Sequence, residues 1–221
     1  MRLVAHRGFA GVAPENTLLA VERAARVADG VEVDVRRCGS GELVVVHDET
    51  VDRVTGGTGR VADLDLGTLQ SLSVGGSGEP IPTLAAVVAA VPPDVELLVE
   101  LKEPGLAAET LALCATADVT VLVQSFDEAA LAEAREAAPS VPRSLLFAEE
   151  PEAGLAAARE LDCAAVGVHH ERCTASFVRA AHDAGLSVYA WTVTDRESAA
   201  RLAAAGVDAV ISDVPDVLPG S

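Results

Sequence analysis

Short apolar runs recur along the chain, and most are followed by a segment whose apolar residues return every three or four positions. The runs are typical of buried strands, and the longer spacing is typical of amphipathic helices. The pattern therefore predicts strand and helix in regular alternation. The predicted strands are Leu3–Ala5, Val31–Val35, Leu43–Val46, Val95–Leu101, Val119–Gln124, Ser144–Phe147, Ala165–Val168, Ser187–Trp191 and Ala209–Ile211.

The intervening segments carry helix signals. Pro14-Glu15-Asn16-Thr17 opens a helix that should run to about Ala28, with Asn16 or Thr17 as its N-cap because either side chain can accept a hydrogen bond from the first turn. The other predicted helices are Leu66–Leu72, one that begins at Pro82 and is ended by Pro92-Pro93, Leu106–Ala115, Glu128–Ala137, Ala153–Leu161, Ala175–Ala184 and Arg196–Ala205.

This order of elements predicts the fold class. The strand Leu43–Val46 follows a Gly-rich turn and forms a hairpin with the strand before it, which leaves eight strands in the alternation. Alternating strands and helices favour a parallel sheet, and eight such units make a (β/α)₈ barrel of the TIM type, an α/β fold. We expect one barrel domain over residues 1–221, with a short connection over 49–80 and a shortened or missing final helix. A doubly wound open sheet is the alternative, but no GxGxxG motif follows the first strand.

Composition narrows the partners and the compartment. The formal net charge of −18 argues against nucleic acids and anionic membrane surfaces as partners. No apolar run is long enough to span a membrane, and the first residues do not resemble a signal peptide. The four cysteines have neither disulfide-like nor zinc-binding spacing, so we predict reduced thiols in a cytoplasmic protein without stable membrane association.

Acidic residues lie where strand interiors are normally apolar. Glu32 and Asp34 are two residues apart on the second strand and therefore point to the same face, as Glu100 and Lys102 do on the next parallel strand. In a (β/α)₈ barrel the active site lies at the carboxyl ends of the strands. Three carboxylates without a thiolate form a hard-oxygen site, which suits Mg²⁺ or Ca²⁺ better than zinc.

Cationic and imidazole side chains are predicted at the same end of the barrel. Arg7 and Lys102 provide fixed positive charge of the kind that holds phosphate, while His6 and His47 end strands and can serve as general acid and base near neutral pH. Trp191 also ends a strand. A divalent metal, two cations and two histidines together favour the chemistry of phosphate esters, so we predict an enzyme.

Four further polar residues are assigned structural roles. We expect Asp213 to cap or brace the end of the barrel and Asn16 to be a helix cap rather than a substrate ligand. The pair His169-His170 follows the sixth barrel strand, and we expect both to be solvent-exposed loop residues.

The chain resembles the glycerophosphodiester phosphodiesterase family in motifs that follow the family's order over nearly its whole length. The matching residues are His6-Arg7-Gly8, Pro14-Glu15-Asn16-Thr17, Glu32-Val33-Asp34, Val46-His47-Asp48, Arg53-Thr55-Gly56-Gly59, Ile81-Pro82-Thr83-Leu84, Glu100-Leu101-Lys102, Ser125-Phe126, Trp191-Thr192-Val193, Gly206-Val207-Asp208 and Ser212-Asp213-Val214-Pro215.

The resemblance implies a phosphoric diester hydrolase that releases an alcohol and sn-glycerol 3-phosphate from sn-glycero-3-phosphodiesters, which are small-molecule substrates. It implies a divalent metal, Mg²⁺ or Ca²⁺, on Glu32, Asp34 and Glu100. His6 and His47 would be the acid/base pair, Arg7 and Lys102 would contact phosphate, and Trp191 would pack near the glycerol. Two alternatives stay open: an enzyme similar to lysophospholipase D or sphingomyelinase D, and a barrel that binds phosphodiesters without turnover.

Overall fold

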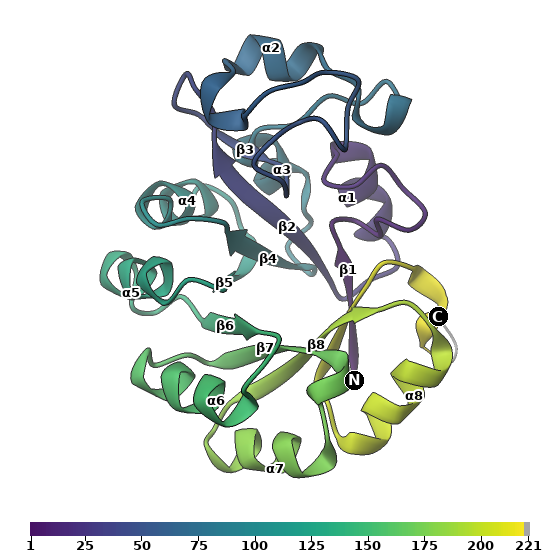
Figure 1. The fold of residues 1–221 in the computed structure, drawn as a ribbon, viewed down its shortest axis with the longest axis vertical. Coiled ribbons are helices and arrows are strands. Elements are labelled where there is room, and N and C mark those ends of the chain that lie inside the picture. Colours follow the sequence, from purple (N-terminus) through teal and green to yellow (C-terminus); the bar gives the residue numbers. More distant parts are fainter. Residues whose placement is uncertain (219–221) are drawn as a thin grey trace.

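Eight parallel strands close into a barrel in the computed structural model, which describes residues 1–218 (Figure 1). The sheet runs in the order β1-β9-β8-β7-β6-β5-β4-β2, and a pairing of β1 with β2 completes the closure. The barrel strands are β1 (Arg2–His6), β2 (Gly30–Arg37), β4 (Glu96–Leu101), β5 (Thr120–Ser125), β6 (Arg143–Phe147), β7 (Ala165–His169), β8 (Ser187–Val193) and β9 (Ala209–Ser212). The predicted TIM-type barrel is confirmed, and the open sheet is excluded.

Helices surround the strands as the alternation predicted (Figure 1). They are α1 (Leu18–Ala24), α2 (Leu66–Ser71), α3 (Leu84–Ala90), α4 (Ala107–Cys114), α5 (Glu128–Ala137), α6 (Pro151–Glu160), α7 (Ala175–Asp183) and α8 (Arg196–Ala205). After β9 the described chain forms only a 3₁₀ turn, Pro215–Val217, which confirms the shortened final helix.

The first helix is shorter than predicted. It begins after Thr17, whose side chain accepts a hydrogen bond from the backbone N–H of Ala20, and its last helical residue is Ala24. Thr17 is therefore the N-cap, and the expectation that Asn16 caps this helix is wrong. The chain from Ala25 to Ala28 continues in turns, which are held by backbone bonds to the last carbonyls of the helix.

Alternation along each strand sorts side chains between two apolar regions. One set points outward under the helices and forms the main core, and the other points into the barrel. The inward set contains Val4, Leu98, Leu122, Ala165, Tyr189, Ala209 and Ile211. At the amino ends of the strands, Arg2 lies over the Tyr189 ring and pairs with Glu96 at 2.8 Å, which closes that end of the barrel.

The segment between β2 and α3 has a small core of its own. The strand β3 (Leu43–Val45) pairs antiparallel with β2, and the connection 49–80 then passes over β3 with α2 at its outer side (Figure 1). Its apolar residues pack with those of β3 and its turn, and we call this group the second core: Cys38, Val44, Val46, Val51, Val54, Val61, Leu69, Val74 and Ile81. The connection is therefore packed against the barrel hairpin rather than loose.

Strand register determines which side chains meet at the carboxyl ends. Neighbouring residues across β1 and β2 are His6 and Glu32, and across β2 and β4 they are Asp34 and Glu100. The next strand adds Gln124 opposite Glu100. Inward residues at one level of a barrel share a layer, so the register places the polar residues together above the apolar layer.

No helix within residues 1–218 combines the length and apolar character needed to cross a bilayer.

The apolar layer inside the barrel should contribute strongly to stability. Leu98 is fully buried there, so Leu98→Ala should lower the free energy of unfolding by about 2–5 kcal/mol, the usual range for a buried leucine. Val27 is 62% exposed, and Val27→Ala should change the free energy of unfolding by less than about 0.5 kcal/mol. Urea unfolding followed by circular dichroism measures both values, and similar losses in the two variants would contradict a packed barrel interior.

Candidate active site

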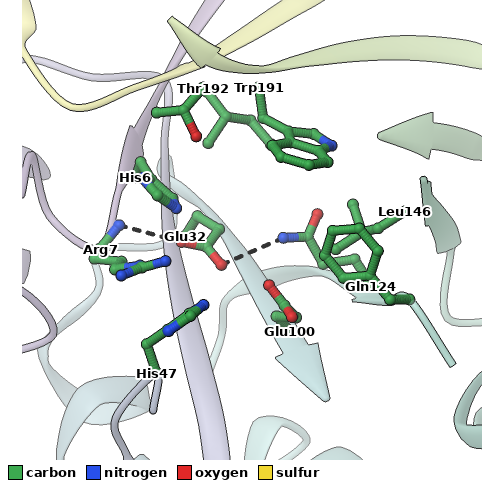
Figure 2. Close-up of a pocket in the computed structure, with 11 residues that line it drawn as sticks. His6, Arg7, Glu32, His47, Glu100, Gln124, Leu146, Trp191 and Thr192 are labelled. Carbon is green, nitrogen blue, oxygen red and sulfur yellow. Dashed lines mark hydrogen bonds between the residues drawn. The ribbon is translucent and has the colours of Figure 1, made fainter. Parts of the chain in front are cut away.

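A cavity of about 140 Å³ opens at the carboxyl ends of the strands, above the apolar layer. Figure 2 shows the imidazoles of His6 and His47 projecting toward Glu32 from opposite sides, with Gln124 and Trp191 on the facing wall. The remaining lining residues are Arg7, Glu100, Phe126, Leu146, Thr192 and Ile211. Six of the eight predicted site residues therefore line one cavity. Of the other two, Asp34 lies in a group with Glu32 and Glu100, and Lys102 contacts Asp34 and Glu100.

A left-handed turn after β1 places Arg7 at this cavity. Three consecutive residues, Arg7, Gly8 and Phe9, have φ values of 51°, 75° and 69°. Gly8 is required by space as well as by conformation, since a Cβ there would lie 2.7 Å from that of Ala20. The turn directs the backbone N–H of Arg7 to Glu32 Oε2, which accepts it at 3.1 Å. Backbone strain of this kind is common where a functional side chain must be held in place.

Three buried carboxylates form the floor of the site. Glu32, Asp34 and Glu100 are at most 7% exposed, and each offers an oxygen within 4.8 Å of those of the other two. Burial and the charges of its two neighbours raise the pKa of Glu32 well above its usual value. Burial and Asp34 raise the pKa of Glu100 to about 7. The structure thus brings together the three carboxylates that the sequence analysis grouped.

Two cationic side chains contact these carboxylates and offset part of their negative charge. Arg7 Nε lies 3.2 Å from Asp34 Oδ2, while Lys102 Nζ lies 2.6 Å from Glu100 Oε1 and 3.4 Å from Asp34 Oδ1. Burial by itself would raise the pKa of Asp34, but the charges of Arg7 and Lys102 outweigh it and lower that pKa below its usual value. Asp34 is thus the carboxylate that stays ionised most readily.

The three carboxylates fit a divalent cation. Asp34 Oδ1 is buried and accepts no hydrogen bond from the described residues, so it retains a lone pair for a ligand. The donor set consists only of carboxylate oxygens, which Mg²⁺ and Ca²⁺ prefer. Burial and mutual repulsion hold the pKa values of Glu32 and Glu100 high, and a cation would relieve the repulsion.

Each cavity histidine has a carboxylate behind it. His6 Nδ1 lies 2.7 Å from Asp213 Oδ1, and His47 Nδ1 lies 2.6 Å from Asp48 Oδ1. A carboxylate at Nδ1 favours the tautomer with its proton there, which leaves Nε2 free to accept one. Burial lowers the pKa of His47 below its usual value. Asp213 therefore orients His6, and the prediction that it only caps or braces the barrel end is too limited.

Asn16 holds a metal-ligand candidate rather than a helix end. It is 3% exposed, it has a φ of 60°, and its Nδ2 donates to Asp34 Oδ2 at 2.8 Å. Its own side-chain oxygen accepts the backbone N–H of Asp34 at 3.4 Å. Asparagine is suited to this left-handed backbone position. In the sequence, the Pro-Glu-Asn-Thr motif was the signal that could have indicated this role of Asn16.

The remaining wall of the cavity is mostly apolar and includes two aromatic residues, Phe126 and Trp191. The Trp191 ring meets Phe126 edge-on at 5.4 Å and His169 at 5.3 Å. Gly167 makes room for this wall, because a Cβ there would clash with Leu146. The prediction that His169 and His170 are merely exposed loop residues is wrong: both are half-buried, and His169 packs on Trp191.

Several polar residues of the site were not singled out from the sequence. Gln124 donates from Nε2 to Glu32 Oε1 at 3.3 Å, and its Oε1 is buried without a partner among the described residues, like Trp191 Nε1. Arg53 contacts both Glu15 and Asp48. The predicted pairing of the strands that carry Glu100 and Gln124 could have indicated Gln124, and Arg53 belongs to a motif that resembles the family's. Neither signal identified the residues that these two side chains contact.

Comparison with known proteins gives consistent matches. The model of the glycerophosphoryl diester phosphodiesterase family matches residues 6–217. A glycerophosphodiester phosphodiesterase of Caldanaerobacter subterraneus subsp. tengcongensis is 32% identical over 231 residues, which cover 98% of this chain and 95% of the relative.

Solved structures agree with the sequence comparison. A phosphodiesterase of Oleispira antarctica, in complex with the product sn-glycerol-3-phosphate, superposes with a TM-score of 0.89 at 32% identity, covering 97% of this chain and 94% of that one. A glycerophosphodiester phosphodiesterase of Agrobacterium tumefaciens superposes with a TM-score of 0.86 at 28% identity, covering 98% of each chain.

The raised pKa of Glu100 predicts a pH dependence of stability without metal. A carboxyl whose pKa rises from 4.5 to about 7 on folding stabilises the fold while protonated, and this stabilisation is lost as pH rises toward 7. In EDTA, the unfolding free energy of Glu100→Gln relative to the wild type should therefore increase between pH 5 and pH 7.5. Glu22 is exposed, so Glu22→Gln should track the wild type. Parallel curves for all three proteins in urea titrations would contradict the raised pKa.

Proposed function

The chain belongs to the glycerophosphoryl diester phosphodiesterase family, whose activity makes it a phosphoric diester hydrolase, and from this premise we propose that it hydrolyses sn-glycero-3-phosphodiesters with a divalent metal, Mg²⁺ or Ca²⁺. The products would be an alcohol and sn-glycerol 3-phosphate. The observation that carries the proposal is one cavity with three clustered carboxylates, two cations and two carboxylate-backed histidines.

The charge of the site supports a phosphodiester as the substrate. A divalent ion together with Arg7 and Lys102 carries four positive charges, and the three ionised carboxylates carry three negative ones. The site with its metal would thus have one net positive charge, which matches the single negative charge of a phosphodiester. This local balance matters because the whole chain has a formal net charge of −18, which repels anions at longer range.

Glu32, Asp34 and Glu100 would hold the metal. The bound ion would supply Lewis acidity, stabilising negative charge on phosphate oxygens and lowering the pKa of a coordinated hydroxyl. Arg7 and Lys102 would orient the phosphate from the same floor. Asn16 and Gln124 would keep Asp34 and Glu32 in position through their side-chain hydrogen bonds.

His6 and His47 would divide the proton transfers between them. One Nε2 would take a proton from the attacking hydroxyl, which is that of water or the glycerol 2-hydroxyl, as its oxygen bonds to phosphorus. Attack by the 2-hydroxyl would give a cyclic phosphate, which water would then open to sn-glycerol 3-phosphate. The other histidine, protonated, would give a proton to the alcohol oxygen as its bond to phosphorus breaks. Asp213 and Asp48 would stabilise each imidazolium as it forms. Trp191 would pack against the glycerol from the cavity wall.

The two alternatives have less support. A lysophospholipase D-like or sphingomyelinase D-like enzyme needs apolar surface for an acyl chain, and of the large exposed apolar residues within 1–218 only Phe126 lines the cavity. At about 140 Å³ the cavity is also smaller than the roughly 300–1,000 Å³ of drug-sized sites. A barrel that only binds phosphodiesters would need the cations but not two histidines with carboxylates behind them.

The central experiment measures sn-glycerol 3-phosphate released from glycerophosphocholine. Activity should disappear with EDTA and return with Mg²⁺ or Ca²⁺, and Asp34→Asn should abolish turnover, since an amide holds a hard cation less well than a carboxylate. Asp94 is exposed and lies outside the site, so Asp94→Asn should retain activity. Full turnover in EDTA would exclude the metal, and absence of turnover under all these conditions would exclude this substrate.

The histidine pair predicts a second kinetic pattern. His6→Ala and His47→Ala should each lower kcat by roughly 10²-fold or more, the usual scale for losing a general acid or base. The double variant should lose less than the product of the two effects if both act in one step. His182 lies on a helix face with Asp208 at 2.9 Å, and His182→Ala should keep wild-type kcat. Single variants with unchanged kcat would exclude the pair.

A further inference from the structure

Arg53 joins two carboxylates of the site, Glu15 and Asp48. Its NH1 and NH2 bind the two oxygens of Glu15 at 2.7 and 2.8 Å, and its Nε binds Asp48 Oδ2 at 2.5 Å. Both carboxylates have a second partner in the cavity: Glu15 accepts from Arg7 NH1 at 3.0 Å, and Asp48 contacts His47 Nδ1. A guanidinium that engages two carboxylates fixes both their positions and their orientations.

The turn that carries Arg53 is anchored by the second core. Val51 and Val54 flank Arg53 and are at most 8% exposed, and the backbone N–H of Thr55 bonds to the Val51 carbonyl at 3.0 Å. The turn is fastened at both ends: Val51 N–H binds Gly59 O at 3.0 Å, and Gly75 N–H binds Val54 O at 2.7 Å. The side chain of Arg53 is 50% exposed, yet its base is held rigidly.

Charges of alternating sign therefore form a continuous chain around one side of the cavity. It runs from Asp34 through Arg7 and Glu15 to Arg53, and from Arg53 through Asp48 to His47. The hydrogen bonds of Arg53 and His47 lower the pKa of Asp48 to about 2 despite its partial burial, so this carboxylate is ionised at neutral pH. Without Arg53, nothing else described contacts Asp48 from the side opposite His47.

We propose that Arg53 is a positioning residue for the reaction, which holds His47 in its productive tautomer and orientation through Asp48 and steadies the phosphate-binding Arg7 through Glu15. The inference rests on the proposed function of the cavity. It gives the connection 49–80 a role in catalysis, because the second core carries the group on which His47 depends.

The two effects should differ in size. Arg7 keeps a second anchor, Asp34, at 3.2 Å when Arg53 is removed, whereas the only described partner of His47 Nδ1 is Asp48. Loss of Arg53 should therefore lower the rate of the chemical step more than it lowers the affinity for phosphate. A side chain with a purely structural role has no reason to produce this split.

The test compares Arg53→Met and Arg53→Lys with Arg60→Met. Arg60 lies on the same connection and pairs with Glu49 at 3.4 Å, but it contacts no site residue, so its variant is the matched control. Arg53→Met should lower kcat on glycerophosphocholine by roughly 10–100-fold, the usual effect of removing an outer-shell partner. The Kd of sn-glycerol 3-phosphate, measured calorimetrically with Mg²⁺, should rise by less than about threefold. Arg53→Lys should lie between, since an ammonium keeps the charge but not the two-point contact.

A second readout needs no substrate. Nitrogen-15 NMR of the His47 ring should show the Nδ1–H tautomer in the wild type and in Arg60→Met, and a mixture of tautomers in Arg53→Met. Asp48→Asn should lower kcat by a smaller factor in the Arg53→Met background than in the wild type, because both substitutions break the same chain. If the wild type turned over no glycerophosphodiester, the proposed function would fail while the NMR result still tested the positioning.

Three results would overturn the inference. They are wild-type kcat in Arg53→Met, an unchanged His47 spectrum in that variant, and a kcat loss no larger in Arg53→Met than in Arg60→Met. Thermal unfolding of each variant shows whether lost activity only reflects a lost folded fraction, which would also count against it.

Discussion

The repulsion among three buried carboxylates is the constraint on which the rest of the site depends. Glu32, Asp34 and Glu100 lie within 4.8 Å of one another at the carboxyl end of the barrel, where burial leaves water to screen little of their charge. The surrounding polar groups offset that repulsion. Arg7 and Lys102 pair with the acids, and Asn16 and Gln124 donate hydrogen bonds to them. The positive charge that keeps the acids together is the same charge that a phosphate would meet.

The fold and the floor of this site could be predicted from the sequence because both depend on local periodicity. Alternation of apolar runs with helical spacing gave the barrel, and the two-residue spacing of Glu32 and Asp34 placed both on an inward face. Parallel register then brings Glu100 level with Asp34. Errors of extent, such as the first helix that ends at Ala24 instead of about Ala28, arose where turns continue the helical hydrogen bonds without its conformation.

The supporting residues could not be predicted, because their roles come from contacts between distant parts of the chain. Asp213 is 207 residues from its partner His6, and Gln124 is 92 residues from Glu32. An asparagine before a helix is a reasonable cap on propensity alone, and only the left-handed turn and the position of Asp34 make Asn16 a buried donor. His169 was misjudged for the same reason: its neighbour Trp191 belongs to the next strand in the barrel.

The closure of the barrel by its first and last strands has a consequence for biosynthesis. Of the barrel strands, β1 is made before the others and pairs with β9, which follows them all, and the carboxylate that orients His6 comes directly after β9. A ribosome-bound chain can hold most of the parallel sheet before that strand emerges, but the edges of β1 and β8 then remain open. Until β9 docks, His6 therefore lacks the carboxylate that orients it. Synthesis that stalls before residue 209 would leave two unpaired edges for a chaperone to shield.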